Sequence, residues 1–578
     1  MRKYETERVM CKDTLLKDGD YKSTKEVFER IAHYLPDTKI LGELNEKREI
    51  VYHTAKEILN DIENIGDGLI DLGLEDKHIV LLAENSYRYL ICDMAIAGGV
   101  GVVTPIDKDA EESLLITLLK KCDADAIICS SYLIKKLEKI LPECPNVKNV
   151  ITIDKKVENY ISLDEVMKKG ESLKDKAYYK NKQLDLDKVC EILFTSGTTG
   201  ANKAVMLTQN NLSANIINCG DMIKGETKDN TSMSILPMHH ATEINTHIMP
   251  RIAFGRLTYI SPSMKDMMTN IKIFKPYIIT VVPMIANAFY KNIWLNAKKQ
   301  GKEKKLKKGI KLCKLLRKFG CDITHKLFKD LYEPFGGNLR QMVCGGAPLD
   351  PEVVKGLTDL GIFIINGYGI TECGPLVSMN TDTVKDTFSI GTCAPQLEAK
   401  IYSPDENGVG ELCIRGKSVS KGYYKDPEST KMVFDEDGFF HTGDLAKQKK
   451  NGRLYMAGRK KNLIVLDNGK NVFPEELEQN IINEIKYIKE VVVFEDEIKF
   501  KNDFKKAICS IVVLDDENKN ISTQQILNDF RKLNSNLANY KKIAYVEISE
   551  TDFEKNPSRK IIRPLAYKKH SKTNGIII

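Results

Sequence analysis

Residues 189–208 read VCEILFTSGTTGANKAVMLT, in which two apolar runs flank a loop rich in glycine and hydroxyl side chains. Apolar runs of this length, bounded by turn-forming residues, are typical of buried strands. Thr208 ends the second run and precedes QNNLSANII, so we predict that its side chain caps a helix there. The stretch therefore predicts a strand, a loop, a second strand and a helix in that order.

The loop itself, TSGTTGANK at 195–203, offers backbone N–H groups, hydroxyls and one lysine, which are the donors that hold phosphate oxygens. It is not a Walker A loop, because GxxxxGK[ST] is absent and the chain returns into a second strand instead of a helix. No GxGxxG follows a strand, so dinucleotide binding has no support. A tight hairpin is the structural alternative, but its positions would not need so many phosphate donors. The loop predicts a phosphate site.

The surrounding sequence predicts an α/β fold with parallel sheets. Between residues 79 and 130, short apolar runs such as IVLLA and AIICS alternate with helical patterns, which is the signature of βαβ units. We predict a second block of the same kind from about 189 to 370. Residues 400–460 read as short strands separated by the turn formers PDENG, DEDG and KNG, and the chain after 462 reads as a small α+β domain. We therefore expect a large N-terminal domain over 1–459, with a β-rich subdomain at about 390–459, and a small mobile C-terminal domain over 460–578.

Composition indicates a globular enzyme-sized protein. The chain has 578 residues, 42% hydrophobic and 29% charged, and a net charge of +7 from 87 basic and 80 acidic groups. That small excess does not predict a nucleic-acid partner. The 14 cysteines form no CxxC pair, so we expect neither zinc ribbons nor disulfides but a reducing, cytoplasmic location. No apolar run reaches the length of a membrane span.

One segment, Lys298–Lys318, holds eleven basic residues and a single acid, Glu303. Four apolar residues recur in it at helical spacing: Leu306, Ile310, Cys313 and Leu316. A helix with an apolar stripe and lysine flanks could lie on the inner, anionic face of a membrane. The alternative is a solvated surface helix whose stripe packs on its own protein.

Several ordered motifs carry a resemblance to a known family. Besides FTSGTTGANKAVMLT they are LPMHH (236–240), CGGAPL (344–349), NGYGITECGP (366–375), GELCIRGKSVSKGYYKDPEST (410–430), FHTGDLA (440–446), GRKKNLIVLDNGKNVFPEELE (458–478) and NPSRKIIR (556–563). Together they resemble the adenylate-forming, or AMP-binding, superfamily. The match is most like the long-chain and medium-chain fatty acyl-CoA synthetases.

The resemblance implies a two-step ligase that uses ATP, Mg²⁺ and coenzyme A. A carboxylic acid, by this likeness a fatty acid, would attack the α-phosphate of ATP to give acyl-AMP and pyrophosphate, and the acyl group would then pass to coenzyme A. Loading of an acyl or aryl acid onto the phosphopantetheine of a separate carrier protein is the alternative that keeps the first step. A regulator that kept the fold without the reaction is a third hypothesis, which Glu372, Asp444 and Arg459 oppose.

The resemblance also assigns residues to the nucleotide. It implies that Thr371 binds the α-phosphate and that Glu372 ligates Mg²⁺, a cation that prefers carboxylate oxygen. Asp444 would hold the ribose hydroxyls and Arg459 the ribose or phosphate. The β- and γ-phosphates would lie on Thr195, Ser196, Gly197, Thr198, Thr199, Gly200 and Lys203, and the adenine and its surroundings on Gly345, Gly346, Ala347, Asn366, Gly367, Tyr368, which stacks on the base, and Gly369.

The acyl site would lie at the LPMHH motif, with Met238, His239, His240 and Ala241 as its lining and His240 at its mouth. Relatives for long acyl chains commonly have an aromatic residue after the paired histidines, where this chain has Ala241 and Thr242, so chain length stays open. His239, His240, Glu243 and His247 could instead suggest a metal site, but HExxH is absent and no fourth ligand is evident.

The C-terminal domain would carry the conformational switch. Lys461 matches the family's hinge, and the loop around Gly469 would join the site for the thioester step. Lys560 matches the lysine that bridges the carboxylate and the α-phosphate. The family usually has glycine before that lysine, where this chain has Arg559, so Lys555 and Arg559 are rival candidates.

Overall fold

The computed structural model describes residues 21–196, 202–222, 229–380, 386–466, 470–500, 503–518, 521–555, 561–570 and 575–578. These residues fall into two compact units. The first extends to Ala399 and includes Ile414–Phe440 and Asn451–Leu454, whereas the second comprises Lys400–Cys413, His441–Lys450 and the chain from Tyr455 onward.

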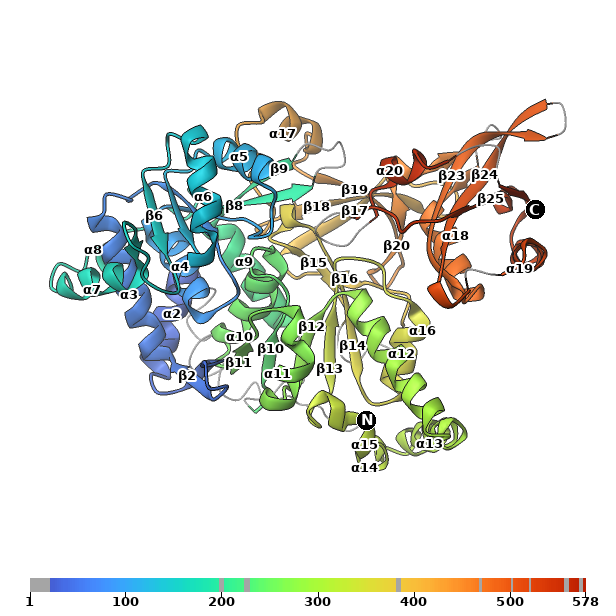
Figure 1. Ribbon diagram of the computed structural model, residues 1–578, viewed down its shortest axis with the longest axis horizontal. Helices are drawn as coiled ribbons and strands as arrows, with labels where there is room; N and C mark the ends of the chain where they lie inside the picture. The colour runs from blue at the N-terminus through green and yellow to red at the C-terminus, as the bar shows by residue number, and fades with distance from the viewer. Residues whose placement is uncertain are drawn as a thin grey trace. The chain divides into compact units, whose positions relative to one another are not determined.

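The first unit contains a seven-stranded sheet of order β7-β6-β5-β3-β4-β8-β9 (Figure 1). Its strands are β3 His78–Leu82, β4 Val102–Pro105, β5 Ala126–Cys129, β6 Asn149–Thr152, β7 Ile161–Ser162, β8 Val189–Ser196 and β9 Asn202–Thr208. Neighbouring strands are parallel, apart from the antiparallel pair β8 and β9. The predicted βαβ units, the two strands β8 and β9 and the helix that follows them are confirmed, and residues 197–201 of the predicted loop lie outside the described residues.

Helices cover both faces of this sheet, which explains the continuous apolar runs of its strands. Ile79 and Leu81 pack on one face with α3 Ala55–Asp71 and α4 Tyr87–Ala95. Val80 and Leu82 point to the other face and pack with α5 Glu112–Lys121 and α6 Ile134–Ile140. Side chains of successive strand residues alternate between faces, so every residue of IVLL is buried.

The first unit also contains the consecutive strands β16-β15-β14-β13-β12-β10-β11-β1-β2, which are nine strands of a thirteen-stranded sheet. These nine strands are β1 Lys39–Leu44, β2 Ile50–Thr54, β10 Ser232–Ser234, β11 Thr258–Ile260, β12 Ile278–Val281, β13 Gln341–Cys344, β14 Phe363–Gly369, β15 Leu376–Met379 and β16 Gly391–Cys393. The strands from β1 to β14 in this order are parallel. The predicted second block therefore begins at β10 and not at residue 189, because β8 and β9 complete the first sheet.

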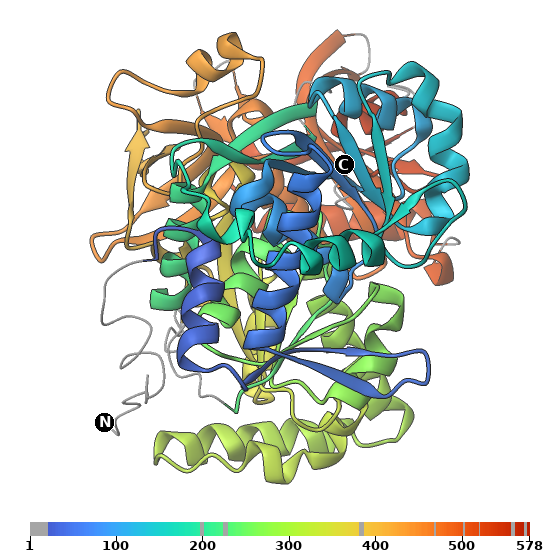
Figure 2. The same cartoon turned by 90° about the vertical axis from the view of Figure 1, so that its left-hand side faces the viewer.

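The remaining helices of the first unit lie around these sheets (Figures 1 and 2). They are α2 Thr24–Tyr34, α7 Leu163–Ser172, α8 Tyr178–Asn181, α9 Gln209–Met222, α10 Met249–Ala253, α11 Met267–Phe274, α12 Pro283–Lys299, α13 Glu303–Lys318, α14 Thr324–Leu327, α15 Lys329–Tyr332, α16 Pro351–Asp359 and α17 Pro427–Val433. Among the described helices, none combines the length and the apolar character needed to cross a bilayer.

Helix starts follow local side-chain chemistry. Thr208 Oγ1 accepts from the N–H of Asn211 at 3.3 Å, and Asn211 Oδ1 accepts from the N–H of Thr208 at 3.0 Å, so the predicted cap of α9 is confirmed in reciprocal form. Thr54 and Glu57 make the same reciprocal pair at the start of α3. Ser522 caps α19 Thr523–Ser535, its side chain accepting from the N–H of Gln525.

The β-rich subdomain consists of β17 Leu397–Tyr402, β18 Val409–Gly416, β19 Phe440–Gln448 and β20 Arg453–Arg459. Each of these four strands has residues in both units. The sequence pattern predicted three of them from their flanking turns. It did not predict β19, because FHTGDLAKQ contains a glycine and polar residues and lacks regular alternation.

The second unit is the predicted α+β structure. Its four-stranded sheet has the order β23-β24-β25-β26, with β23 Ile488–Phe500, β24 Asp503–Leu514, β25 Ile543–Ser549 and β26 Ile576–Ile577. Its helices are α18 Pro474–Glu484, α19 and α20 Arg563–Tyr567, and a small two-stranded sheet pairs β21 Ile464–Val465 with β22 Asn471–Val472. Ile481, Val493 and Phe530 form part of the core between helices and sheet.

The predicted apolar stripe of the basic segment lies on α13. Leu306 and Cys313 are buried, Ile310 is partly buried, and all three pack with Phe328 and Tyr332 in the core of the first unit. Three of the four stripe residues therefore pack on the chain's own core, which was the alternative to membrane contact through these residues, and Leu316 is half-buried outside that cluster. The rest of the helix surface carries basic residues together with the exposed Leu312 and Leu315.

Two acidic side chains are buried in the core, Glu191 of β8 and Asp93 of α4. Glu191 Oε2 accepts a hydrogen bond from Asn245 Nδ2 at 3.0 Å, whereas Asp93 Oδ2 has no hydrogen-bond partner among the described residues. Burial raises the pKa of Glu191 to about 7. Burial and the neighbouring Glu191 raise the pKa of Asp93 well above its usual range. Ionising both of two adjacent buried carboxyls costs more free energy than ionising one of them. The free energy of unfolding therefore depends on the protonation of this pair, and so on pH.

Glu191→Gln should stabilise the protein at about pH 8 but not at about pH 5. The unfolded carboxyl titrates near 4.5 and the folded one near 7, so the folded state keeps a proton that the unfolded state releases in between. Wild-type stability therefore falls as pH rises through this window and stays lower above it, whereas the amide has no such penalty. The free energy of unfolding of the variant minus that of the wild type, measured by urea unfolding, should rise by roughly 1–3 kcal/mol between about pH 5 and about pH 8. The exposed Glu171, changed in the same way, is the control, and equal responses of both variants would contradict the account.

Candidate active site

The predicted phosphate loop joins the ends of β8 and β9. Thr195 pairs with Lys203 and Ser196 with Asn202 across the two strands. Gly197, Thr198, Thr199 and Gly200 lie outside the described residues, as does the side chain of Ser196. The described part of the motif is thus its two strand ends, and these bring Thr195 beside Lys203.

Lys203 lies over an aromatic ring that the sequence alone did not single out. Its Nζ is 4.4 Å from the centre of the Tyr423 ring, a cation–π distance. Tyr423 comes from the segment that follows the motif GELCIRG and forms a bridge with Val205 of β9. Backbone bonds from Met206 N to Gly422 O at 2.9 Å and from Tyr424 N to Ala204 O at 2.8 Å fix this segment against β9.

Tyr423 in turn contacts the predicted metal ligand. Its Oη donates to Glu372 Oε1 at 3.0 Å. Burial and the Glu372 carboxylate raise the pKa of Tyr423 above its ordinary value, so the phenol stays protonated and remains a donor. The backbone N–H of Ser420 donates to the carbonyl of Glu372 at 2.8 Å. A cation–π contact and a hydrogen bond therefore connect Lys203, Tyr423 and Glu372 in a row beside β9.

The predicted adenine residues lie at the carboxyl ends of adjacent parallel strands. Gly345, Gly346 and Ala347 follow β13, and Asn366 and the residues after it end β14, with Cys344 in register with Asn366. The carboxyl edge of a parallel sheet is the usual position for a ligand site. Gly346 has a φ of +84°, which favours glycine, and Gly346 and Ala347 are exposed.

The chain then turns back from β14 toward Glu372. Gly367 pairs with Met379, Tyr368 with Ser378, and Gly369 with Leu376, all across the antiparallel β14 and β15. Thr371 and Glu372 lie in the short 3₁₀ turn Thr371–Cys373 between these strands, and both are half-buried. The nucleotide residues of the NGYGITE motif therefore share one strand end and one turn.

The LPMHH segment is held by a residue far away in sequence. Asn85 Nδ2 donates to Leu236 O at 2.7 Å, and Asn85 Oδ1 accepts from Met238 N at 2.9 Å. Met238 and Ala241 are buried, whereas His239 and His240 are half-buried with ring centres 4.3 Å apart. Burial, with His240 and Lys108 nearby, holds the pKa of His239 well below its usual range, so this imidazole is neutral at physiological pH.

The helix after the two histidines is a π-helix, Thr242–Ile248. Within it His247 Nδ1 lies 3.1 Å from Glu243 Oε1, and Glu243 Oε1 also accepts from Ile235 N at 3.2 Å. His239 and His240 do not join them, since among the described residues only Glu411, Cys413 and His441 bring three potential metal ligands within 4.8 Å. The zinc alternative at the histidine motif is therefore not supported.

Asn215 of α9 joins the π-helix that follows the LPMHH motif to β15, which follows the NGYGITECGP motif. This fully buried side chain donates from Nδ2 to Asn245 O at 2.6 Å and accepts at Oδ1 from Leu376 N at 3.0 Å. It satisfies one backbone group on the π-helix and one on β15, which would otherwise be buried without a partner. Sequence analysis missed Asn215, and only its position in the helix after the phosphate loop could have indicated it.

In the second unit, the predicted ribose ligands contact each other. Arg459 Nε lies 3.0 Å from Asp444 Oδ1, and Asp444 is nearly fully buried. Next to them Glu411 accepts from His441 Nδ1 at 3.0 Å, Lys460 Nζ at 2.7 Å and Gly443 N at 3.1 Å. Burial would raise the pKa of Glu411, but the bonds from Lys460 and His441 outweigh it and hold the pKa below its usual value. A carboxylate engaged in this way has little capacity left for a metal ion.

The predicted switch residues are described only in part. Lys461 lies in the 3₁₀ turn Lys460–Asn462 directly after β20. Gly469, Arg559 and Lys560 lie outside the described residues. The rival candidate Lys555 is ion-paired with Glu490 and forms a backbone bridge with Ile561.

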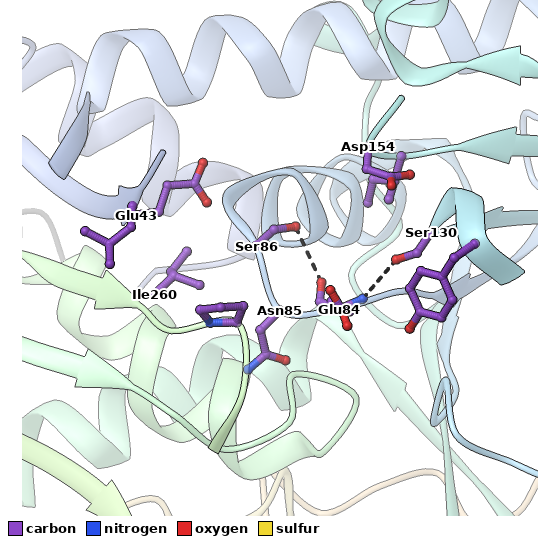
Figure 3. Close-up of a pocket in the computed structure, with 11 residues that line it drawn as sticks. Glu43, Glu84, Asn85, Ser86, Ser130, Asp154 and Ile260 are labelled. Atoms are coloured by element: carbon purple, nitrogen blue, oxygen red, sulfur yellow. Dashed lines mark hydrogen bonds between the residues drawn. The ribbon is translucent and has the colours of Figure 1, made fainter. Parts of the chain in front are cut away.

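A separate pocket of about 240 Å³ lies beside Asn85 in the first unit (Figure 3). Figure 3 shows the carboxylates of Glu43, Glu84 and Asp154 around it, together with Ser86 and Ser130. None of the predicted acyl residues lines it. The lining also includes Leu44, Ile153 and Ile260, but its three carboxylates would repel both the phosphates of ATP and the carboxylate of an acid. We therefore do not assign the acid or the ATP to this pocket.

Comparison with known proteins gives consistent matches. The profile described as AMP-binding enzyme matches residues 28–424. Similar curated proteins include long-chain-fatty-acid–CoA ligase 5 of Rattus norvegicus, which is 27% identical over 83% of this chain and 74% of its own length. Fatty acyl-CoA synthetase B of Dictyostelium discoideum is 30% identical over 84% of this chain and 75% of its own length. Among solved structures, ATP-bound MatB from Rhodopseudomonas palustris has a TM-score of 0.73 at 20% identity, covering 94% of this chain and 98% of its own. This last likeness concerns the fold alone.

Proposed function

The chain belongs to the AMP-binding enzyme family, and from this premise we propose its substrate and the work of its residues. It is an ATP-dependent acid–CoA ligase that passes through an acyl-adenylate. We propose that the acid is a fatty acid, because the similar curated proteins include long-chain and fatty acyl-CoA synthetases.

The reaction has two steps. In the first, a carboxylate oxygen attacks the α-phosphorus of ATP, the bond to the β-phosphate oxygen breaks, and pyrophosphate leaves. In the second, the sulfur of coenzyme A attacks the acyl carbon, and the bond to the AMP oxygen breaks. Both reactants of the first step are anions, so positive charge and aimed N–H or O–H dipoles must offset their repulsion.

The contacts among Lys203, Tyr423 and Glu372 support the proposed binding of the ATP phosphates. Lys203 and the loop Thr195–Gly200 would hold the β- and γ-phosphates, and Thr371 the α-phosphate. Glu372 suits Mg²⁺, because its carboxylate offers hard oxygen donors and Tyr423 engages only one of its two oxygens. The ion would neutralise charge on the triphosphate when bound. Tyr423 would orient the Glu372 carboxylate through its hydrogen bond, while Lys203 supplies a positive charge.

The remaining residues would position the nucleoside and the acid. Gly345–Ala347, Asn366, Gly367 and Gly369 would line the adenine site, with Tyr368 stacked on the base. Asp444 would accept the ribose hydroxyls, and Arg459 would fix Asp444 and donate to the nucleotide. We assign Met238, His239, His240 and Ala241 to the acyl site. A neutral His239 would add no positive charge beside an apolar acyl chain.

The C-terminal part would carry the change between the two steps. We propose that a small domain over 460–578 turns about Lys461, brings Lys560 to the carboxylate for adenylation, and brings the loop around Gly469 in for thioester formation. The alternative acceptor is the phosphopantetheine of a separate carrier protein.

A graded panel of acids tests the proposed substrate. With ATP, Mg²⁺ and coenzyme A, we expect kcat/KM for a long fatty acid to exceed that for acetate by at least about a hundredfold, because each buried methylene adds binding energy. Pyrophosphate release and thioester formation are measured in parallel, with a holo-carrier protein as the other acceptor. Thioester on the carrier alone, or a preference for short or aromatic acids, would contradict the proposal.

A further inference from the structure

The outer surface of α13 carries large apolar side chains that its own protein does not cover. Leu312 is 45% exposed, Leu315 52% and Phe319, which follows the last turn, 79%. Figure 1 and Figure 2 place this helix at the rim of the first unit. These residues differ from the stripe that the sequence pattern singled out, which points into the core.

The three side chains share one face of the helix. Their spacings of three and four residues bring them above one another, roughly opposite the buried Leu306 and Cys313. The helix thus has two apolar faces, one already used for packing and one open to solvent. Scattered single apolar residues are ordinary on a surface, but a row of three on one helix face is a candidate contact.

Basic residues surround this row. Lys304, Lys308 and Lys311 precede Leu312 and Leu315 on the same side of the helix, are exposed, and form no ion pair among the described residues. The segment 298–318 as a whole has eleven basic residues and one acid, and that acid, Glu303, is paired with Lys307.

This combination favours one occupant. A second copy of the chain would bring two strongly basic helices together, which like-charge repulsion opposes. Nucleic acid would use the lysines but leave the leucines and Phe319 in water. An anionic lipid surface uses both, because apolar side chains enter the acyl boundary while lysine ammonium groups stay at the phosphates. We propose that the exposed face of α13 docks the enzyme on an anionic membrane surface.

The proposal rests on the helix and not on the identity of the acid, so its failure would leave the proposed function standing. If both hold, docking places the enzyme where long-chain acids dissolve. The fold itself has no need of the exposed face, since the buried stripe already anchors α13.

Flotation of the full chain with vesicles tests the proposal. We expect binding to phosphatidylcholine vesicles containing about one-third phosphatidylglycerol, weaker binding without the anionic lipid, and release by salt. The combined Leu312→Gln, Leu315→Gln and Phe319→Gln variant should lose at least about tenfold in partition coefficient. Lys304→Gln, Lys308→Gln and Lys311→Gln together should lose a similar factor on anionic vesicles.

The matched control is Met432→Gln with Phe388→Gln, two side chains 76% and 71% exposed elsewhere in the first unit. It should bind vesicles as wild type does. Because all substituted positions are exposed, unfolding midpoints should be unchanged in every variant, which excludes misfolding. Wild-type-like binding by the triple apolar variant, no binding of the wild type to anionic vesicles, or retention on RNA without vesicle binding would each overturn the proposal.

Discussion

Glu372→Gln should slow adenylation by about a thousandfold, the largest loss expected from any single change in the first unit. The amide keeps an oxygen that can accept the Tyr423 hydrogen bond, so local structure should survive. It removes the negative charge that we assign to Mg²⁺, so charge on the triphosphate would be less well neutralised. The measurement is acid-dependent exchange of labelled pyrophosphate into ATP, titrated with Mg²⁺.

Tyr423→Phe is the matched control for this variant. It removes the donor to Glu372 but leaves the carboxylate and the ring under Lys203, so we expect a loss of about tenfold or less. Half-saturation in Mg²⁺ should shift strongly for Glu372→Gln and weakly for Tyr423→Phe. Equal losses in both variants with an unchanged Mg²⁺ dependence would assign Glu372 to structure and not to the metal.

Lys560→Ala should abolish adenylation, by at least about a thousandfold, while thioester formation from supplied acyl-adenylate stays largely intact. A lysine that bridges the carboxylate and the α-phosphate acts only while those two anions approach. Once the adenylate exists, that charge no longer lowers the barrier. The two half-reactions are therefore measured separately on the same preparation.

Lys555→Ala and Arg559→Ala distinguish the rivals. Lys555 is ion-paired with the buried Glu490, so its loss should mainly lower stability by leaving that carboxylate without its cation. We expect Arg559→Ala to retain adenylation within about tenfold. Selective loss of adenylation in either rival, with Lys560→Ala active, would move the role to that residue. Equal loss of both half-reactions in Lys560→Ala would indicate a structural role.

Local patterns predicted much of the fold because they report local physics. VCEILF and KAVMLT predicted β8 and β9, and Thr208 predicted the cap of α9, since burial and capping act over a few residues. The partner of each strand was harder to predict. The pairing of β8 with β4 of the first sheet depends on contacts between segments far apart in sequence, and it shifted the start of the second parallel block to β10.

The same limit applies to the site. The motifs assigned roles to Glu372 and Lys203 but none to Tyr423, which contacts both. Tyr423 lies more than two hundred residues after β9, and its role depends on contacts that the sequence does not show. Asn85 and Asn215 act through backbone groups, so no motif marks them. Helical spacing found the stripe of α13 that packs inward, and only three-dimensional burial revealed the second, exposed row at Leu312, Leu315 and Phe319.

Transfer of oxygen from the acid to AMP tests the central claim most directly. The enzyme is supplied with a fatty acid whose carboxylate carries heavy oxygen, together with ATP, Mg²⁺ and coenzyme A, and the products are weighed by mass spectrometry. If the carboxylate attacks the α-phosphorus, AMP carries one heavy oxygen atom and pyrophosphate carries none. Label in inorganic phosphate with ADP as the product, or thioester formation with unlabelled AMP, would contradict the acyl-adenylate route.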